Sequence, residues 1–410
     1  MRETTDSPTD TVVLPPHPPA DAPGGIDLKF RPDVEGLRAV AVVVVVLFHA
    51  GVNWFRGGYI GVDVFFVVSG FLITGLLLRE HERRGRISLP GFYARRARRI
   101  LPAAMFVIIL SVLASYYIQN FIQYGSVAQD GRWTALFAGN IHFGTVGTGY
   151  FQQLAAPSPL EHYWSLAVEE QFYLVWPALV LLVGAVFTRI PLRWRVAAVA
   201  ACATAASLTW SVIQTHDVPT WAYFSPFTRA WELGVGAIAA TLAPQCARLP
   251  RAFGSAIAYA GLAAITTSAL WFTSSTPFPG TAALLPVLGA VAVVAGGASG
   301  TGAGHLLGLG PVRSVGRVSF GWYLLHYPPM IILTGALWTH PLSVQENLLI
   351  AAATLVGAYC MYAVLERPIR RSSFLAYRPW LSISMGGAFI VAAFLVCYLL
   401  HPSLHHLWLS

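Results

Sequence analysis

Apolar residues in this chain gather into blocks of about twenty, and this repeated pattern limits the possible folds more than any other feature. A helix of about twenty apolar residues crosses the hydrocarbon core of a bilayer. Only 11% of the residues are charged and 56% are hydrophobic, whereas a soluble domain carries about 25% charged residues. The pattern predicts an all-α fold: a polytopic helical membrane protein of about eleven (roughly ten to twelve) transmembrane helices.

The predicted spans are the uninterrupted apolar blocks. They cover 38–55, 59–79, 100–118, 163–187, 196–213, 223–244, 254–272, 281–298, 316–337, 345–365 and 380–400. A further apolar stretch, 133–151, is broken by glycine, asparagine and histidine, which favours a re-entrant or interfacial segment over a span. We therefore expect one transmembrane domain over residues 29–400.

The two ends of the chain differ from the apolar blocks. Residues 1–28 are rich in Pro, Thr, Asp and Ala and have almost no large apolar side chains. Such a composition cannot bury a core, so we expect a disordered cytoplasmic tail there. No apolar region follows a basic start, so no cleaved signal peptide is predicted. Residues 401–410 are expected to form a short external C-terminus.

Arginines are distributed unevenly between the predicted loops. Cytoplasmic loops of membrane proteins carry an excess of Lys and Arg. Alternate loops here are basic and the loops between them hold only Arg56 and Arg132. The distribution predicts a multi-pass protein of the cell membrane with a cytoplasmic N-terminus, and it explains the net charge of +8 without a nucleic-acid partner. The basic loops contain Arg79, Arg83, Arg84, Arg86, Arg95, Arg96, Arg98, Arg99, Arg189, Arg193, Arg195, Arg248, Arg251, Arg313, Arg317, Arg367, Arg370, Arg371 and Arg378.

The first predicted span contains an arginine and a histidine. Ionisable residues at membrane depth are costly and mark functional sites. His49 follows Arg38 by eleven residues, which is three turns plus about 20°, so the two side chains share a helical face about 16 Å apart. Arg38 is either a snorkelling charge that sets topology or a functional cation. His49 is either a packed, hydrogen-bonded histidine or a catalytic base.

Two acidic residues are candidates to support a histidine. Asp63 lies early in the second span, where a carboxylate beside His49 would orient and stabilise the imidazole. The alternative is an acid favoured by the helix dipole. Glu169 and Glu170 point about 100° apart in the fourth span, so at least one faces the bundle interior or a wet cavity. Glu169 shares a face with Tyr173, which indicates a polar strip inside the bundle.

A dense cation cluster opens the third span, where four arginines occupy five positions. Arg96 and Arg99 share a helical face, and guanidinium forks suit phosphate oxygens. The alternative is positive-inside charge or binding of anionic lipid headgroups. The cluster consists of Arg95, Arg96, Arg98 and Arg99.

Other polar or small residues within the spans have structural interpretations. Arg229 and Glu232 are three positions apart and are expected to pair. Ser69 and Gly70 favour close helix contact over a nucleophilic role. His326 shares a face of the ninth span with Ser319 and Tyr323.

Seven of these stretches together resemble the membrane O-acyltransferases of the OafA/YrhL type, called acyltransferase family 3. They run in the family's order from residue 29 to about 372: RPDVEGLRAVAVVVVVLFHA, GGYIGVDVFFVVSGFLIT, FYARRARRILP, HYWSLAVEEQFYLVWP, RAWELGVGA, VSFGWYLLHYPP and LERPIR. The resemblance implies transfer of an acyl group, often acetyl, to a hydroxyl. It also implies the Arg38–His49 and Arg96–Arg99 pairs as functional positions. Ten residues follow the last predicted span, so we expect the stand-alone form that lacks a C-terminal esterase-like domain.

The resemblance leads to a specific mechanism. An acyl group, expected to be acetyl, moves from acyl-CoA to a hydroxyl of a carbohydrate, cell-envelope glycan or secondary metabolite, without a metal. His49 is expected to be the general base, with Asp63 or Glu169 orienting its imidazole. Direct attack by the hydroxyl is preferred because no thiol or activated serine is evident, and an acyl-histidine is the alternative. The expected donor site contains Arg38, Arg95, Arg96, Arg98 and Arg99.

Two other functions are alternatives. One is a membrane transporter or flippase of a polar or glycosylated substrate, with Arg229, Glu232, Glu169 and His326 along its path. Transporters often contain inverted repeats, and the sequence shows none. The other is the second membrane-bound O-acyltransferase fold, whose histidine normally lies late in the chain rather than in the first span.

Overall fold

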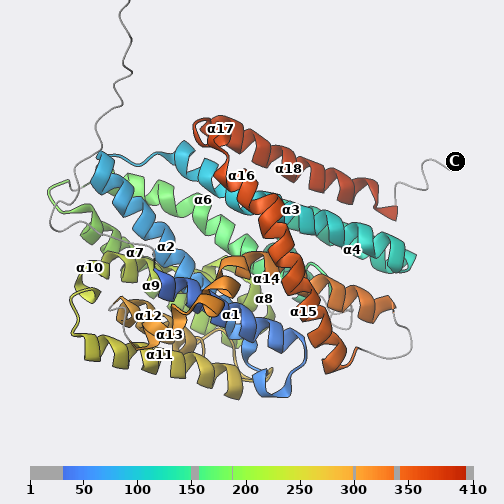
Figure 1. Ribbon diagram of the computed structural model, residues 1–410, viewed down its shortest axis with the longest axis horizontal. Helices are drawn as coiled ribbons and strands as arrows, with labels where there is room; N and C mark the ends of the chain where they lie inside the picture. Colours follow the sequence, from blue (N-terminus) through green and yellow to red (C-terminus); the bar gives the residue numbers. More distant parts are fainter. Residues whose placement is uncertain (1–30, 149–156, 187, 299–301, 337–341, 403–410) are drawn as a thin grey trace, which may run out of the picture.

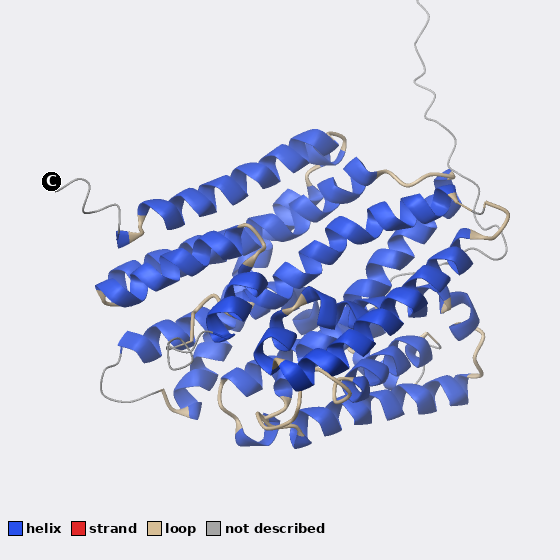
Figure 2. Ribbon diagram, turned by 180° about the vertical axis from the view of Figure 1, so that it is seen from behind, coloured by secondary structure: helices blue, strands red, loops and turns tan. Residues whose placement is uncertain are grey.

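The protein is described by a computed structural model, which covers residues 31–148, 157–186, 188–298, 302–336 and 342–402. Every regular element in these ranges is a helix, as Figure 2 shows. The helical class predicted from the sequence is therefore confirmed. The expected tail at 1–28 and most of the expected C-terminal segment lie outside the described residues.

The helices alternate with short connections along the whole chain. The first half forms α1 Pro32–His49, η1 Asn53–Phe55, η2 Gly58–Ile60, α2 Gly61–Arg84, α3 Leu89–Ile118, α4 Phe121–Ala135, α5 Gly139–Thr148, α6 Tyr163–Ala185 and α7 Leu192–Asp217. The second half forms α8 Pro219–Phe224, α9 Pro226–Thr241, α10 Ala243–Cys246, α11 Arg251–Trp271, α12 Leu284–Gly297, α13 Ala303–Leu307, α14 Gly310–Ala336, α15 Val344–Met361, the π-helical turn η3 Tyr362–Glu366, α16 Arg367–Arg371, α17 Ser373–Ala376 and α18 Pro379–Leu399.

Local sequence sets several helix ends. Helix α2 ends at Gly85, whose φ of +68° is left-handed and suits glycine. Helix α3 begins after Ser88, whose hydroxyl accepts a hydrogen bond from the Gly91 N–H at 3.2 Å. Helix α4 begins with a capping box in which Asn120 and Gln123 satisfy each other's backbone N–H groups.

Seven helices within the described ranges are long and apolar enough to cross a membrane, judged by length and composition. The predicted count of about eleven is not confirmed on this criterion. The other four predicted spans fall on α1, α9, α12 and α14. Helix α12 has 14 residues, a rise of about 21 Å against a hydrocarbon core of about 30 Å. Helix α9 has only 16 residues, and α1, α9 and α14 carry ionisable residues.

Three of these four helices lie inside the bundle. Figure 1 shows α18 and α11 at opposite edges, with α1, α9 and α14 between them. Helix α1 packs against α2, α12, α13 and α14, and α9 packs against α2 and α7. The contact between α2 and α9 is close because a Cβ on Gly70 would lie 1.9 Å from the Leu233 carbonyl oxygen. Helices enclosed by protein can carry ionisable residues, as α1, α9 and α14 do. Helix α2 is also enclosed, but it is apolar enough to meet the criterion.

The interrupted stretch at 133–151 is divided between two helices. Helix α4 ends at Ala135, and Phe137 has a positive φ of 54° before α5 begins at Gly139. Helix α5 has ten residues, a rise of about 15 Å or half of the hydrocarbon core. It is too short to span the core on its own. Residues 149–151 lie outside the described residues, and whether the segment enters the membrane stays a prediction.

Candidate active site

A basic cavity opens at the N-terminal end of α1. We call this cavity of about 540 Å³ the basic vestibule, and its lining includes six arginines and two glutamates. Glu35 pairs with Arg313 at 3.1 Å and with Arg317 at 3.8 Å. Within the described residues, neither Arg38 nor Arg99 forms an ion pair with a carboxylate. The six arginines are Arg38, Arg99, Arg313, Arg317, Arg370 and Arg371.

These six arginines come from four helices. Helices α1, α3, α14 and α16 supply them from regions that the arginine distribution assigned to one side of the membrane. The sequence analysis assigns Arg313, Arg317, Arg370 and Arg371 to basic loops and does not predict that they share a cavity with Arg38. No local signal links them, because they are brought together by helix packing.

A narrow cavity of about 70 Å³, the middle cavity, adjoins the vestibule. Arg38 and Arg99 line both. Glu169 lines the middle cavity and accepts hydrogen bonds from the Ser69 hydroxyl at 2.8 Å and the Tyr173 hydroxyl at 3.2 Å. The polar strip expected on this face of α6 is therefore present. Ser69 contributes to it through a polar contact, in addition to any packing role.

The four clustered arginines of α3 separate into two sets. Arg96 and Arg99 line the middle cavity, and the Arg96 guanidinium carbon lies 4.0 Å from the centre of the Tyr173 ring. Arg95 instead pairs with Glu80 at 2.8 Å. Arg98 is buried and lines neither cavity. Only two of the four are thus placed to meet a ligand in these cavities.

The largest of the three cavities, of about 930 Å³, lies at the other end of α1, and we call it the histidine chamber. Val62 and Tyr323 line both this chamber and the middle cavity. Its polar lining includes His49, His162 and Glu161. Burial raises the pKa of Glu161, which precedes α6, to about 7. The aromatic rings around the chamber belong to Phe48, Tyr59, Trp164, Tyr223, Phe224, Phe278, Tyr323 and Tyr327.

His49 has another histidine as its polar partner. Its Nδ1 lies 2.9 Å from Nε2 of His326 on α14, and the ring of Tyr327 is 4.6 Å away between centroids. The sequence placed Asp63 or Glu169 beside this imidazole, but in the described residues neither carboxylate hydrogen-bonds to it. The sequence analysis gives His326 as a polar residue on one face of its span and as part of the transporter alternative, and no spacing rule connects positions 49 and 326.

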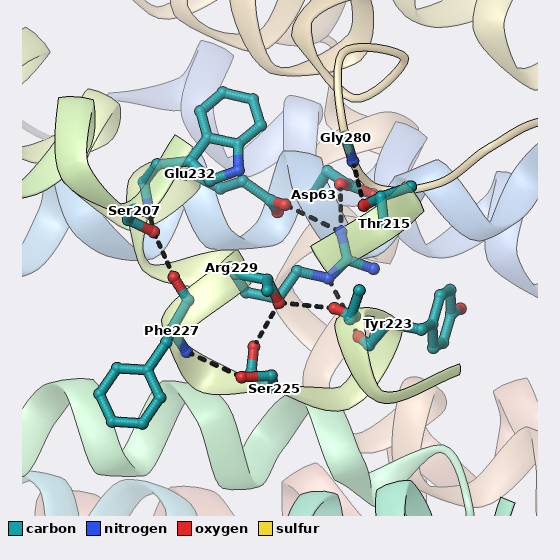
Figure 3. A network of polar contacts seen from close by, with 12 residues as sticks. Asp63, Ser207, Thr215, Tyr223, Ser225, Phe227, Arg229, Glu232 and Gly280 are labelled. Carbon is teal, nitrogen blue, oxygen red and sulfur yellow. Dashed lines mark hydrogen bonds and ion pairs between the residues drawn. The ribbon is translucent and has the colours of Figure 1, made fainter. Parts of the chain in front are cut away.

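Asp63 belongs to a separate buried network, centred on Arg229. Figure 3 shows the guanidinium between Asp63 and Glu232, to which Nη1 donates at 2.9 and 2.8 Å. Its Nε donates to the Tyr223 carbonyl at 3.1 Å. All three ionisable side chains are 1% exposed or less. The pair expected between Arg229 and Glu232 is confirmed, and Asp63 joins it instead of orienting His49.

The Arg229 network forms part of the chamber wall. The guanidinium carbon lies 5.0 to 5.2 Å from the ring centres of Trp164, Tyr223 and Phe278, which all line the chamber. Removing one member of a buried ion pair leaves an uncompensated charge and costs about 3–5 kcal/mol. The buried guanidinium therefore supports the chamber wall by packing against these three rings. Within the described residues, no group of three or more His, Cys, Asp or Glu side chains is arranged to hold a metal ion.

Comparison with known proteins identifies the family. Residues 31–402 match a family described as an acyltransferase domain. The chain is 32% identical over 357 residues to the peptidoglycan O-acetyltransferase OatA of Listeria monocytogenes, covering 85% of this chain and 57% of that protein. It is 32% identical over 360 residues to the putative peptidoglycan O-acetyltransferase YrhL of Bacillus subtilis, covering 85% and 56%.

A third relative is more distant. The O-acetyltransferase OatA of Staphylococcus aureus is 28% identical over 365 residues, covering 85% of this chain and 58% of that protein. The chain thus spans little more than half the length of the curated relatives it matches. No solved structure matches it. With the family matched from residue 31 to residue 402, the chain belongs to the acyltransferase family that its motifs resemble.

Proposed function

We propose that this protein moves an acetyl group from acetyl-CoA to a hydroxyl of a cell-envelope glycan. The nucleotide end of the donor binds in the basic vestibule, on the cytoplasmic side, and the glycan enters the histidine chamber. The observation that carries the proposal is the series of three adjoining cavities from the six arginines to His49. Membership in an acyltransferase family argues against the transporter alternative.

Charge supports the placement of the donor. Coenzyme A carries several phosphate charges, and guanidinium groups bind phosphate oxygens in paired hydrogen bonds. With six arginines and two glutamates, the vestibule lining has an excess of positive charge. Arg38 and Arg99 stand where the vestibule meets the middle cavity, so they are suited to hold the diphosphate at the opening.

The length of the coenzyme A arm also supports this placement of the donor. About twelve bonds separate the phosphate ester oxygen of coenzyme A from its sulfur, and a peptide backbone covers about 3.5 Å for every three bonds, so the extended arm reaches about 14 Å. Eleven residues of α1 rise about 16 Å from Arg38 to His49. A donor held by Arg38 through its diphosphate would therefore bring its thioester close to the imidazole.

The reaction at His49 is an acyl transfer by direct attack. The imidazole takes the proton of the acceptor hydroxyl as that oxygen attacks the thioester carbonyl carbon. A C–O bond forms and the C–S bond breaks. The thiolate of coenzyme A leaves and accepts the same proton from the imidazolium, which restores neutral His49. General base catalysis of this kind contributes about 10²- to 10⁴-fold.

The chamber lining supports a carbohydrate acceptor. Aromatic rings such as Tyr59 and Trp164 offer flat apolar faces, and Thr215, Thr276 and Glu161 offer hydrogen-bonding groups. Small-molecule sites commonly combine apolar walls with a few polar groups that fix orientation. Two relatives are named as peptidoglycan O-acetyltransferases, one of them as putative, so soluble peptidoglycan fragments are the first acceptors to test.

The test uses purified protein, acetyl-CoA labelled in the acetyl group, and peptidoglycan fragments. We expect release of free coenzyme A together with ester-linked label on the glycan, and no ester on fragments whose hydroxyls are blocked by methylation. The same measurement with other hydroxyl-bearing glycans sets the acceptor range. Protein that releases no coenzyme A with any acceptor, yet carries a separately labelled glycan across vesicle membranes, would contradict the proposal and favour the transporter.

A further inference from the structure

Two histidines from distant parts of the chain meet at the inner wall of the histidine chamber. Nδ1 of His49 lies 2.9 Å from Nε2 of His326, and the rings are 5.1 Å apart between centroids. His49 is half-buried and lines the chamber. His326 is 0% exposed and does not line it. One imidazole thus faces the substrate space and the other lies behind it.

The backbone of α14 determines which nitrogen of His326 carries the proton. Its Nδ1 lies 2.8 Å from the Tyr323 carbonyl oxygen and 3.2 Å from the Trp322 carbonyl oxygen. A carbonyl oxygen can only accept, so this nitrogen must donate. A neutral imidazole has one donor and one acceptor nitrogen. In neutral His326, Nε2 is therefore the acceptor.

The state of His49 follows from that of His326. Since His326 Nε2 accepts, the nitrogen facing it, Nδ1 of His49, must carry a proton and donate. Neutral His49 then has its lone pair on Nε2, which is the nitrogen a general base needs.

In the opposite arrangement, His49 Nδ1 accepts a hydrogen bond from His326 Nε2. This requires a charged His326, because both of its nitrogens then donate. Within the described residues no carboxylate lies within ion-pair distance of His326. The rings around it belong to His49, His162, Tyr323 and Tyr327. An isolated buried cation without a partner is strongly disfavoured. The geometry therefore favours the neutral pair.

We propose that His326 is the positioning residue that holds His49 in the tautomer with Nδ1 protonated and Nε2 available as the base. The inference rests on the proposed function, because it specifies how the base of that reaction is prepared. When His49 takes the acceptor's proton, its Nδ1–H bond to His326 remains and becomes a charge-assisted hydrogen bond, which is stronger than a neutral one. His326 thus takes the place that the sequence assigned to Asp63 or Glu169.

Two substitutions of different chemistry test the role. Glutamine in His326→Gln keeps an acceptor oxygen for His49 and an N–H group for the backbone carbonyl, whereas leucine in His326→Leu fills a similar volume and accepts nothing. We expect kcat to stay within about tenfold of wild type for the glutamine variant and to fall by at least about a hundredfold for the leucine variant. KM for acetyl-CoA and the melting temperature should change little in either.

If His326 had a purely structural role, kcat would be higher in the leucine variant than in the glutamine variant, because leucine suits a buried apolar position better than glutamine. Near-normal kcat in a folded His326→Leu protein would overturn the inference. So would a folded His326→Gln protein that is as slow as His49→Ala, and this second outcome decides the matter even where the leucine variant does not fold. The double variant His49→Ala/His326→Leu should be no slower than His49→Ala alone, because residues acting through one group are not additive.

A spectroscopic measurement separates this inference from the proposed function. In protein labelled with nitrogen-15 at histidine, the His49 signals are identified by their loss in His49→Ala. We expect Nδ1–H and a bare Nε2 in wild type and in His326→Gln, and a changed tautomer population in His326→Leu. An Nε2–H tautomer in wild type would overturn the inference, whether or not the protein transfers acetyl groups. Wild-type protein with the expected tautomer but no acyl transfer would contradict only the proposed function.

Discussion

The two ends of α1 face cavities of opposite character. The basic vestibule, next to Arg38, has six arginines and two glutamates in its lining. The histidine chamber, next to His49, has aromatic rings and hydroxyl groups, and no Lys or Arg among its described lining residues. Phosphate binding needs positive charge, whereas an imidazole that takes a proton from a hydroxyl must be neutral and close to it. Under the proposed function, this contrast assigns donor binding and chemistry to different ends of one helix.

If this division holds, a substitution at the His49 end should alter kcat and leave donor affinity nearly unchanged. A substitution at the vestibule end should alter donor affinity. The largest effect is expected at the base. His49→Ala should lower kcat by about 10²- to 10⁴-fold while leaving the affinity for a non-hydrolysable acetyl-CoA analogue close to wild type, since the arginines remain. Acetyl transfer and isothermal titration calorimetry measure the two properties.

The chamber offers a matched control for this prediction. His216 also lines the chamber, but its side chain is 91% exposed and pairs with Asp217 at its rim. His216→Ala should therefore leave kcat within a few-fold of wild type. Equal losses in the two alanine variants, or normal turnover in a folded His49→Ala protein, would show that His49 is not the base.

The next largest effect is on stability, at the network behind the chamber wall. Arg229→Met leaves Asp63 and Glu232 buried without a counter-charge, and we expect a loss of about 3–5 kcal/mol of unfolding free energy. Denaturant or thermal unfolding of the purified protein measures it. Arg248 is exposed, so Arg248→Met is the matched control and should change stability by about 0.5 kcal/mol or less. Equal stability of the two variants would exclude a supporting role for the network.

A smaller effect is expected at the vestibule end. Arg96→Gln together with Arg99→Gln removes two guanidinium groups beside the middle cavity while keeping polar side chains. A hydrogen bond to a charged group contributes about 1.5–3 kcal/mol, and about 1.4 kcal/mol is one decade of affinity. Binding of the acetyl-CoA analogue should weaken by at least about tenfold.

Arg95 provides the matched control within the same cluster, because its guanidinium is paired with Glu80. Arg95→Gln should leave affinity for the analogue nearly unchanged. If the double variant binds as well as wild type, the arginine cluster of α3 sets topology or binds lipid, and the donor enters elsewhere. If Arg95→Gln weakens binding as strongly as the double variant, the division of the cluster is wrong.

The smallest effect concerns Glu161 in the chamber. Burial raises the pKa of its carboxyl group from 4.5 to about 7, and Asp130 acts in the same direction. The folded protein then holds this proton more tightly than the unfolded chain does. The resulting stability is present below about pH 4.5 and is lost as the pH rises towards about 7. The melting temperature of wild type should fall more between pH 5 and 7 than that of Glu161→Gln, and parallel curves would contradict this.

Periodicity predicted some of the candidate site correctly. The positions of Arg96 and Arg99 on one helical face, and of Glu169 and Tyr173 on another, follow from 3.6 residues per turn, and both pairs line the middle cavity. The pairing of Arg229 with Glu232 follows from the same rule. Each of these relations joins residues within one helix.

Relations between helices were predicted less well. Asp63 was placed beside His49 because both are polar residues of neighbouring spans, but the packing of α9 against α2 brings Arg229 to it instead. His326 and the vestibule arginines of α14 and α16 were not connected with α1. Helices α1, α9, α12 and α14 also did not meet the criterion of length and apolar composition that the other seven predicted spans met.

The sequence by itself determined the helical class, the apolar character of seven helices long enough to span a membrane, the family, and the residues on each helical face. These properties depend on local composition and on the fixed geometry of one helix, which a linear pattern records. Only the tertiary structure decided that His326 meets His49, that Asp63 meets Arg229, and that arginines of four helices share one cavity. The contact between His49 and His326 joins residues 277 positions apart, and the vestibule arginines extend from Arg38 to Arg371. These relations depend on which helices pack together and at what rotation, which no single helix specifies.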